Sequence, residues 1–457
     1  MATLSEIETW LQDRLATLLA EHQVPGAAVG VLLGDEVIDH AAGVLSRSTG
    51  VEATADSVFQ IGSITKVWTT TLVMQLVDEG KVDLDRPIRS YLPEFVIADD
   101  SAAAVITTRQ LLCHTAGFEG DIFNETGKGD DAVEKFVASL ATTTQLFPPG
   151  EMFSYNNAGF AVLGRLVEVL RGTSYDAALR EHLFTPLGLA HAAGDPYEAI
   201  LHRAAVGHIR PEPDADPVPA PMWAMTRGMA PAGAMLAMSA RDLLTFAKLH
   251  LDQGADVLSA ASVTAMQEAQ VKLPALGMMG ESWGLGWELF DFDGTRVFGH
   301  DGGTIGQNAF LRVLPEHGLA IALLTNGGGT IEVYRAVFEH LLDELAGVTL
   351  PAMPTPPAEP VPVDVTRFLG TYSCEVADIT VRQDEDGKLW LDQVPKGIFT
   401  ELGPTPEPVE LVGRDEQSLI AVEAENGMHQ PHVFVGDDGS GRALYLHSGR
   451  ALRRASA

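Results

Sequence analysis

The chain has 457 residues, of which 46% are hydrophobic and 20% charged, a composition typical of a globular protein with one large domain and a smaller one. Its 30 basic and 62 acidic side chains give a formal net charge of −32, which excludes nucleic acid and anionic membrane surfaces as partners. The two cysteines, Cys113 and Cys374, are far apart and indicate neither a disulfide framework nor a cysteine metal site, and we expect no metal and no cofactor.

The first 23 residues have the spacing of an amphipathic helix. Their apolar positions recur every three or four residues, at Leu4, Ile7, Trp10, Leu11, Leu15, Leu18 and Leu19. No basic stretch precedes a long apolar run, and no segment reaches the roughly 20 apolar residues that span a membrane. We therefore expect this helix to belong to the mature fold and the protein to be cytoplasmic.

Residues 24–44 predict two strands around a turn at residues 34–35. The stretch QIGSITKVWTT then begins a helix in which Ser63 and Lys66 lie three residues apart, and therefore on one face. A lysine can take the proton of a serine hydroxyl where burial lowers the lysine pKa. The flanking residues are apolar and predict a buried segment: Phe59, Ile61, Val67 and Trp68. The pair is thus a candidate nucleophile and base, and the alternative is an ordinary pair on a solvated helix face.

A second candidate site segment precedes an amphipathic helix in the middle of the chain. The stretch FPPGEMFSYNNAGFAVLGRLVEVL places Tyr155 and Asn157 in a loop just before the helical periodicity begins. A phenol near a lysine can pass on a proton, and an amide can hold a substrate carbonyl or the lysine. Alternatively, Tyr155 is an aromatic residue at the helix entry and Asn157 is the helix cap.

Strands return after the helical middle section. SWGLGWELF and RVFGH predict strands on either side of a turn at DFDGT, and NAFLRVLPEHGLAIALLTN predicts a hairpin around residues 315–318. In FGHDGGTIGQ a strand ends at His300, which could orient a proton relay or bind a substrate carboxylate, and Gly302 and Gly303 would let backbone N–H groups approach a ligand. The alternative is a turn with an exposed histidine. A helix over residues 331–346 follows.

Strands at both ends of residues 1–347, with helices between them, predict an α+β fold. We expect an antiparallel sheet built from both ends of this part, flanked by the terminal helices, with an inserted helical region beside it. Residues 348–363, VTLPAMPTPPAEPVPV, predict a stiff proline-rich linker. Residues 364–457 contain short alternating segments separated by turns and predict a small antiparallel β-barrel as a second domain.

Three residue pairs occur in order and at wide spacing: Ser63-x-x-Lys66, Tyr155-x-Asn157 and His300-x-Gly302. Together they resemble the motifs of the serine β-lactamase and penicillin-binding protein superfamily, most closely the branch of class C β-lactamases, D,D-peptidases, D-aminopeptidases and related esterases. Further stretches look like this branch: VPGAAVGV, LLCHTAGF, PPGEMFSYNNAGF, HLFTPLGL and PAGAMLAMSARDL. The resemblance covers about residues 5–346, and the tail resembles the lipocalin-like barrel that some relatives carry.

The resemblance implies a catalytic role for four side chains. Ser63 would be the acylated nucleophile, Lys66 and Tyr155 would share the base role, and His300 would replace the lysine of the more usual Lys-Thr-Gly. This replacement argues against an efficient β-lactamase, because histidine is largely neutral at pH 7 and offers no permanent cation to a β-lactam carboxylate.

The resemblance also implies residues that hold the substrate. Asn157 and Gly302 would line the substrate site, and the backbone N–H groups of Ser63 and Gly303 would form an oxyanion hole, in which one donor is worth about 2.7–4 kcal/mol. We further hypothesise that Arg450 or Arg453 in the final stretch LHSGRALRRASA reaches back from the barrel to bind a substrate carboxylate. The alternative for this stretch is a basic tail.

The expected function is that of a serine hydrolase or acyltransferase that acts on an ester or amide, either a small ester or a peptide with a D-residue. The runner-up is a penicillin-binding-protein-type thioesterase that receives a nonribosomal peptide from a carrier protein and releases it by cyclisation. A β-lactamase or D,D-carboxypeptidase is a further alternative, and a non-catalytic ligand-binding module is the alternative from another class. The expected partner is a small-molecule or peptide substrate.

Overall fold

A computed structural model describes residues 1–457 except 213–214, 278, 398–399, 401–404, 426 and 456–457. An antiparallel sheet of eight strands lies at its centre, in the order β2-β1-β13-β12-β11-β10-β9-β8. The strands are β1 Gly26–Leu33, β2 Glu36–Gly43, β8 Val271–Lys272, β9 Ser282–Trp283, β10 Glu288–Phe292, β11 Thr295–Gly303, β12 Asn308–Leu314 and β13 Leu319–Thr325. β1 pairs with β13, with Ala27 opposite Thr325, which confirms the sheet predicted from both ends of this part of the chain.

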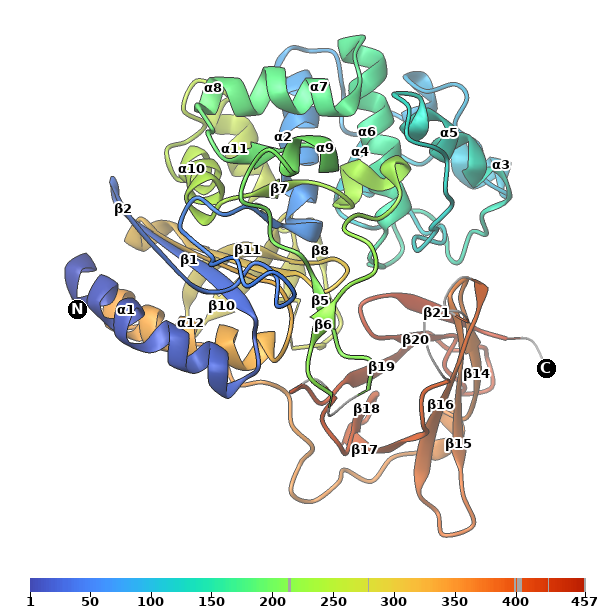
Figure 1. Cartoon of the computed structure of the whole chain (residues 1–457). Coiled ribbons are helices and arrows are strands. Elements are labelled where there is room, and N and C mark those ends of the chain that lie inside the picture. Colours follow the sequence, from blue (N-terminus) through green and yellow to red (C-terminus); the bar gives the residue numbers. More distant parts are fainter. Residues whose placement is uncertain (213–214, 278, 398–399, 401–404, 426, 456–457) are drawn as a thin grey trace.

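Helices cover both faces of this sheet. α1 (Leu4–Glu21) and α12 (Thr330–Ala346) lie along one face, and the helical region lies on the other (Figure 1). The residues of β1 divide between two cores accordingly: Val31 packs in the core with α1 and α12, and Leu32 packs in the core of the helical region. β1 is therefore apolar along its whole length and does not alternate with polar residues.

The two terminal helices are confirmed. α1 begins with a capping box, in which the Thr3 hydroxyl accepts a hydrogen bond from the Glu6 backbone and the Glu6 carboxylate accepts one from the Thr3 backbone. α12 ends at Gly347, whose φ of 64° places it in the left-handed region. Trp10 of α1 stacks on His340 of α12 with ring centroids 4.0 Å apart, which joins the two helices.

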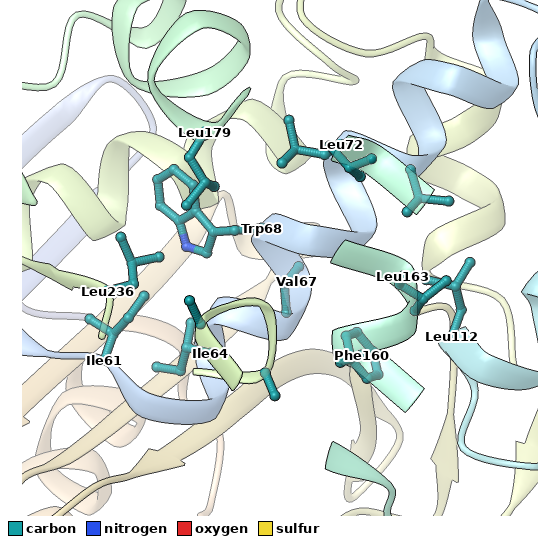
Figure 2. Close-up of a cluster of buried hydrophobic side chains, with 14 of the residues drawn as sticks. Ile61, Ile64, Val67, Trp68, Leu72, Leu112, Phe160, Leu163, Leu179 and Leu236 are labelled. Atoms are coloured by element: carbon teal, nitrogen blue, oxygen red, sulfur yellow. The ribbon is translucent and has the colours of Figure 1, made fainter. Parts of the chain in front are cut away.

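The helical region surrounds α2, whose side chains are buried on all sides. Its helices are α2 Thr65–Asp78, α3 Asp100–Ala103, α4 Thr108–Leu112, α5 Ala132–Ser139, α6 Asn157–Arg171, α7 Tyr175–Leu179, α8 Thr185–Leu187, α9 Pro196–Ala199, α10 Ala240–Leu251 and α11 Ala260–Met266. Trp68 of α2 stacks on Phe246 of α10 at 3.9 Å, and Val67 and Leu72 pack in the same cluster as Leu163 of α6 (Figure 2). The buried threonines of α2 donate to carbonyls of the same helix, Thr70 to Lys66 and Thr71 to Val67, so the helix can enter the core despite its polar residues. This core fixes the start of α2 in place.

Short elements connect the helical region to the sheet. They are the strands β3 Phe59–Gln60, β4 Ala192–Ala193, β5 His208–Ile209, β6 Val218–Pro219 and β7 Ala237–Met238, and the 3₁₀ turns η1 Gly62–Ile64 and η5 Arg227–Ala232. β3 pairs with β7, so the chain just before Ser63 is tied to the chain just after η5.

Two strand boundaries differ from the prediction. SWGLGWELF forms β9 and β10, separated by a turn in which the Gly284 N–H donates to the Trp287 carbonyl at 2.8 Å. β11 does not end at His300 but continues through Gly303 and pairs with β12 along this length. The glycines after His300 are thus part of the sheet, and at Gly302 the close approach of the chain before η1 leaves no room for a side chain.

The carboxyl-terminal part is a closed antiparallel barrel of eight strands. They are β14 Gly370–Ser373, β15 Ala377–Gln383, β16 Leu389–Pro395, β17 Val409–Asp415, β18 Ser418–Ala421, β19 Pro431–Val435, β20 Tyr445–His447 and β21 Ala451–Arg454. The predicted basic tail is wrong: it forms β21, which pairs with β20 and β14 and closes the barrel. Arg454 serves this closure by donating hydrogen bonds to the carbonyls of Leu369 and Ala443.

Residues 348–364, all of them described, contain no helix or strand. Val348 and Leu350 are buried against α1 and α12, and the Val361 N–H donates to the Gly413 carbonyl at 2.9 Å, so both ends of this segment contact folded structure. Its role as a boundary between domains stays a prediction. Within the described part of the chain, no helix has the length and apolar character needed to cross a membrane.

Candidate active site

Ser63 sits in a tight turn between the helical region and the sheet edge. Gly62 has a φ of 52°, which favours glycine, and a Cβ built on it would lie 2.6 Å from the Gly303 nitrogen. A Cβ on Gly302 would lie 1.9 Å from the Ile61 carbonyl oxygen and 3.0 Å from the Ser63 nitrogen. The backbone of β11 therefore lies directly against the turn that carries Ser63.

Lys66 lies one helical turn beyond Ser63 and points toward it. Its Nζ is 3.0 Å from Ser63 Oγ and donates to the Ala232 carbonyl oxygen at 2.6 Å. The side chain is fully buried, and burial lowers the Lys66 pKa well below its usual value. The positive charge of Arg450 lowers this pKa further, whereas Asp121 and Glu288 raise it. A neutral amine at this position can accept the proton of Ser63.

Tyr155 completes a compact group with Ser63 and Lys66. Its hydroxyl is close enough to the Ser63 side chain for Ser63 to lower the Tyr155 pKa, and Lys66 Nζ lies 4.8 Å from the centroid of its ring. The ring stacks on His114, with centroids 4.4 Å apart and planes 27° apart. Burial raises the pKa of Tyr155 above its usual value, so the phenol stays protonated. Of the two side chains, Lys66 is therefore the better candidate to accept a proton.

Asp121 links Asn157 and Arg450. α6 begins at Asn157, and its cap is the preceding Asn156, whose side chain accepts from the Gly159 N–H; the predicted cap at Asn157 is wrong. The Asn157 amide donates to Asp121 Oδ1 at 2.7 Å, and Arg450 forms an ion pair with the same carboxylate through Nε and Nη2.

The turn between β20 and β21 brings Arg450 from the barrel to this site, and three hydrogen bonds hold that turn. The Tyr155 N–H donates to the Gly449 carbonyl at 3.0 Å, the Ala451 N–H donates to the Ser154 hydroxyl at 3.1 Å, and His447 Nε2 lies 2.7 Å from the Phe153 carbonyl oxygen. The barrel faces the helical region along this side (Figure 1). The Arg450 guanidinium carbon lies 5.0 Å from the Tyr155 ring centroid.

His300 lies beside the rings of Tyr155 and Trp283 as a buried, neutral side chain. It is 1% exposed, which excludes the exposed histidine given as an alternative. Its Nδ1 is 2.6 Å from the Asp301 carbonyl oxygen and 3.5 Å from Glu288 Oε1. Burial and the charge of Lys66 lower the His300 pKa to about 3. His300 therefore cannot supply the cation that a lysine would provide.

Four residues near the site were not predicted: His114, Asp121, Trp283 and Glu288. His114 has a φ of 59°, and its Nδ1 accepts from the Asn156 N–H at 2.9 Å. The stretch LLCHTAGF contained a signal for His114, since this stretch matches the family, but Asp121, Trp283 and Glu288 had none. Among the described residues, no group of three or more His, Cys, Asp or Glu side chains could hold a metal ion, and both cysteines are free.

Comparisons with known proteins agree on one family. The family model described as Beta-lactamase matches residues 11–345. Penicillin-binding protein 4 of Amycolatopsis lactamdurans is 47% identical over 371 residues, covering 80% of this chain and 97% of that protein. The unguisins hydrolase ungD' of Aspergillus campestris is 26% identical over 70% of this chain and 62% of that protein. The crystal structure of SurE with D-Leu is 29% identical, has a TM-score of 0.78 and covers 98% of this chain and 99% of that one, barrel included.

Proposed function

Because the chain belongs to the beta-lactamase family, a family of serine hydrolases, we propose that it forms an acyl-enzyme at Ser63 from an ester or amide whose acyl group ends in a D-residue. The observation that carries this proposal is the 3.0 Å separation of Lys66 Nζ and Ser63 Oγ in a buried setting. A lysine buried there serves a reaction better than it serves stability, because burying its charge costs free energy.

The proposed reaction has two halves. Ser63 Oγ attacks the substrate carbonyl as its proton passes to Lys66 Nζ, and the N–H groups of Ser63 and Gly303 bind the oxyanion. The proton then passes by way of the Tyr155 hydroxyl to the leaving oxygen or nitrogen, which breaks away and leaves the acyl-Ser63 ester. In the second half water attacks the acyl carbon and gives a proton to Lys66. The bond between the acyl carbon and Ser63 Oγ then breaks, this proton passes to Ser63 Oγ, and the free acid leaves.

The choice of a D-residue rests on likeness to other proteins. SurE, which is similar to this chain over nearly its whole length, has a crystal structure with D-Leu. The relative named unguisins hydrolase supports hydrolysis and does not bear on the D-residue. We propose that Arg450 binds a substrate carboxylate, because its side chain is 44% exposed and the Asp121 carboxylate takes up only Nε and Nη2.

Two further candidates each have one supporting observation. In cyclisation an amine of the peptide replaces water as the attacking group. The barrel turn at Gly449, which is hydrogen bonded to Tyr155 and borders the site, favours this outcome because cover over the site limits the access of water. Acylation by a β-lactam is favoured by the name of the relative from Amycolatopsis lactamdurans. The neutral His300 argues against efficient β-lactam turnover.

Intact-protein mass spectrometry after brief exposure to a substrate panel tests these proposals. The panel is p-nitrophenyl butyrate, nitrocefin, a D-alanine p-nitroanilide and a peptidyl thioester that ends in a D-residue. We expect a mass increment in the wild type and none in Ser63→Ala, and the product of the thioester separates hydrolysis from cyclisation. If neither the panel nor a fluorophosphonate probe modifies the wild type, the catalytic proposal is wrong and the ligand-binding alternative replaces it.

A further inference from the structure

Two cations from different parts of the chain approach one aromatic ring. Lys66 Nζ, from α2, lies 4.8 Å from the centroid of the Tyr155 ring, and the Arg450 guanidinium carbon, from the barrel, lies 5.0 Å from the same centroid. The base of the proposed reaction is thus near a like charge that another part of the chain supplies. The positive charge of Arg450 lowers the Lys66 pKa, because like charges disfavour each other's protonated forms.

The position of Arg450 depends on how the barrel is docked. Gly449 accepts a hydrogen bond from the Tyr155 N–H, and Ala451 donates one to the Ser154 hydroxyl, so both neighbours of Arg450 are fixed to the segment that carries Tyr155. Asp121 then orients the guanidinium through its ion pair. If the barrel turn left this place, the positive charge would leave with it.

The ionisable groups around Lys66 do not all act in the same direction. Arg450 carries the like charge, whereas Asp121 and Glu288 are acidic and favour the protonated amine. His114 and His300 face the same space as neutral rings, since burial lowers the pKa of each. Tyr155 stays a neutral phenol. Burial and the charge of Arg450 therefore lower the Lys66 pKa, whereas the two carboxyl groups raise it.

We propose that the barrel activates the nucleophile through Arg450, whose positive charge keeps Lys66 in the neutral form that can take the proton of Ser63. Arg450 thereby acts on Lys66 through its charge and is a positioning residue that does not touch the reacting atoms. This role is separate from any contact with a substrate carboxylate. This inference rests on the proposed function of Lys66 as the base. It gives the barrel a role in the chemistry that does not require the barrel to touch the substrate.

The first test measures the pH dependence of kcat/KM on p-nitrophenyl butyrate, an ester without a carboxylate. In Arg450→Gln the acidic limb should move up by about 1 pH unit, so that activity below the limb falls about tenfold while activity on the alkaline plateau is retained. Arg450→Lys, which keeps the charge, should restore most of the wild-type profile. Arg453→Gln removes the same charge from the exposed side of β21 and is the matched control, with an unchanged limb.

A second measurement follows the protonation of Lys66 without catalysis. NMR titration of ¹³Cε-labelled lysine, with the Lys66 signal assigned by its loss in Lys66→Arg, should give a higher midpoint in Arg450→Gln than in the wild type. An equal loss of kcat/KM at all pH values with an unchanged Lys66 midpoint would overturn the inference and leave Arg450 a purely structural or substrate-binding role. Because this readout needs no turnover, it stands even if no substrate acylates Ser63. Thermal melting of Arg450→Gln and Arg450→Lys verifies that both are folded.

Discussion

Lys66 combines full burial with hydrogen-bond contacts to two oxygen atoms of the described residues, Ser63 Oγ and the Ala232 carbonyl oxygen. A protonated lysine has three N–H donors, and two acceptor oxygens of the described residues lie within hydrogen-bond distance of Nζ. The neutral amine fits better: one N–H donates to Ala232, and the lone pair faces the Ser63 hydroxyl. The activity should therefore rise with pH as Lys66 loses its proton.

Lys66→Arg tests this assignment of the base. The guanidinium keeps a positive charge near Ser63 but does not deprotonate at accessible pH, so it cannot act as a base. We expect kcat/KM for p-nitrophenyl butyrate to fall by about 10²–10⁴-fold, the usual contribution of a general base. Lys66→Met should lose a similar factor. If Lys66→Arg kept most of the activity, a positive charge rather than a base would be what Ser63 needs.

His250 is a buried histidine outside the site. It lies between Phe246 and Trp287, and in the part of the chain that the structure describes neither of its ring nitrogens has a hydrogen-bond partner. Burial lowers its pKa to about 3. In the unfolded chain, where the histidine pKa is near 6.5, His250 takes up a proton at a higher pH than it does in the folded protein. His250 therefore reduces the free energy of unfolding as the pH falls from about 6.5 toward 3.

His250→Leu should make the protein less sensitive to acid. Between pH 8 and pH 5 the native His250 reduces the free energy of unfolding by about 2 kcal/mol, and the variant lacks this loss. Urea unfolding at both pH values measures it. The difference in stability between variant and wild type should shift by this amount in favour of the variant, and parallel pH curves for the two proteins would contradict the assignment.

At the scale of elements, the contact between β11 and η1 builds the site. The sheet edge and the Ser63 turn come from opposite ends of the catalytic sequence, and glycine at 62 and 302 lets their backbones approach. The N–H groups proposed for the oxyanion hole belong to these two elements, so their spacing depends on that approach. A displacement of about 1 Å in a catalytic group can reduce a rate by about 100-fold.

Gly302→Ala should therefore impair the reaction through the backbone. The added Cβ would lie 1.9 Å from the Ile61 carbonyl oxygen, which forces β11 away from the turn. We expect at least an approximately 100-fold loss of kcat/KM, measured together with the melting temperature. Gly194→Ala is the control, because its Cβ would meet atoms no nearer than 3.7 Å. Full activity in Gly302→Ala would show that the spacing of these elements is not critical.

At the scale of the whole molecule, the barrel is packed against the catalytic part. Tyr445 and Ala451 of the barrel share a buried cluster with Leu146 and Phe147, and the Tyr445 hydroxyl donates to the Leu146 carbonyl at 3.1 Å. The segment 153–155 is hydrogen bonded to the barrel and leads directly into α6. Unfolding of the barrel should therefore expose the segment that carries Tyr155.

Calorimetry should show one unfolding transition for the wild type. Tyr445→Ala removes the ring that packs on Phe147 and should weaken the packing of the barrel against the catalytic part by about 3–5 kcal/mol. The barrel of this variant should therefore melt at a lower temperature than the catalytic part. Tyr197→Ala, at a position that is 66% exposed, is the matched control with little change. Two transitions in the wild type would mean that the parts unfold independently.

Local patterns predicted much of this fold. Apolar spacing gave α1 and α12, alternation gave the hairpins, and the three-residue spacing of Ser63 and Lys66 placed the two on one helix face. The apolar–polar alternation did not predict β21, because this strand ends in two consecutive arginines, Arg453 and Arg454. Arg454 belongs to the barrel nonetheless, since it donates to a barrel carbonyl. It also failed at β11, where the sheet continues through glycines.

The sequence by itself therefore determined the family, the pair Ser63 and Lys66, and the α+β and barrel architecture, because these depend on spacing within single elements and on motifs that recur as short strings. Only the tertiary structure decided that His300 is neutral, that Asp121 joins Asn157 to Arg450, and that a barrel cation lies by the ring of Tyr155. These properties depend on burial and on charges brought together from distant parts of the chain, and no local pattern encodes either.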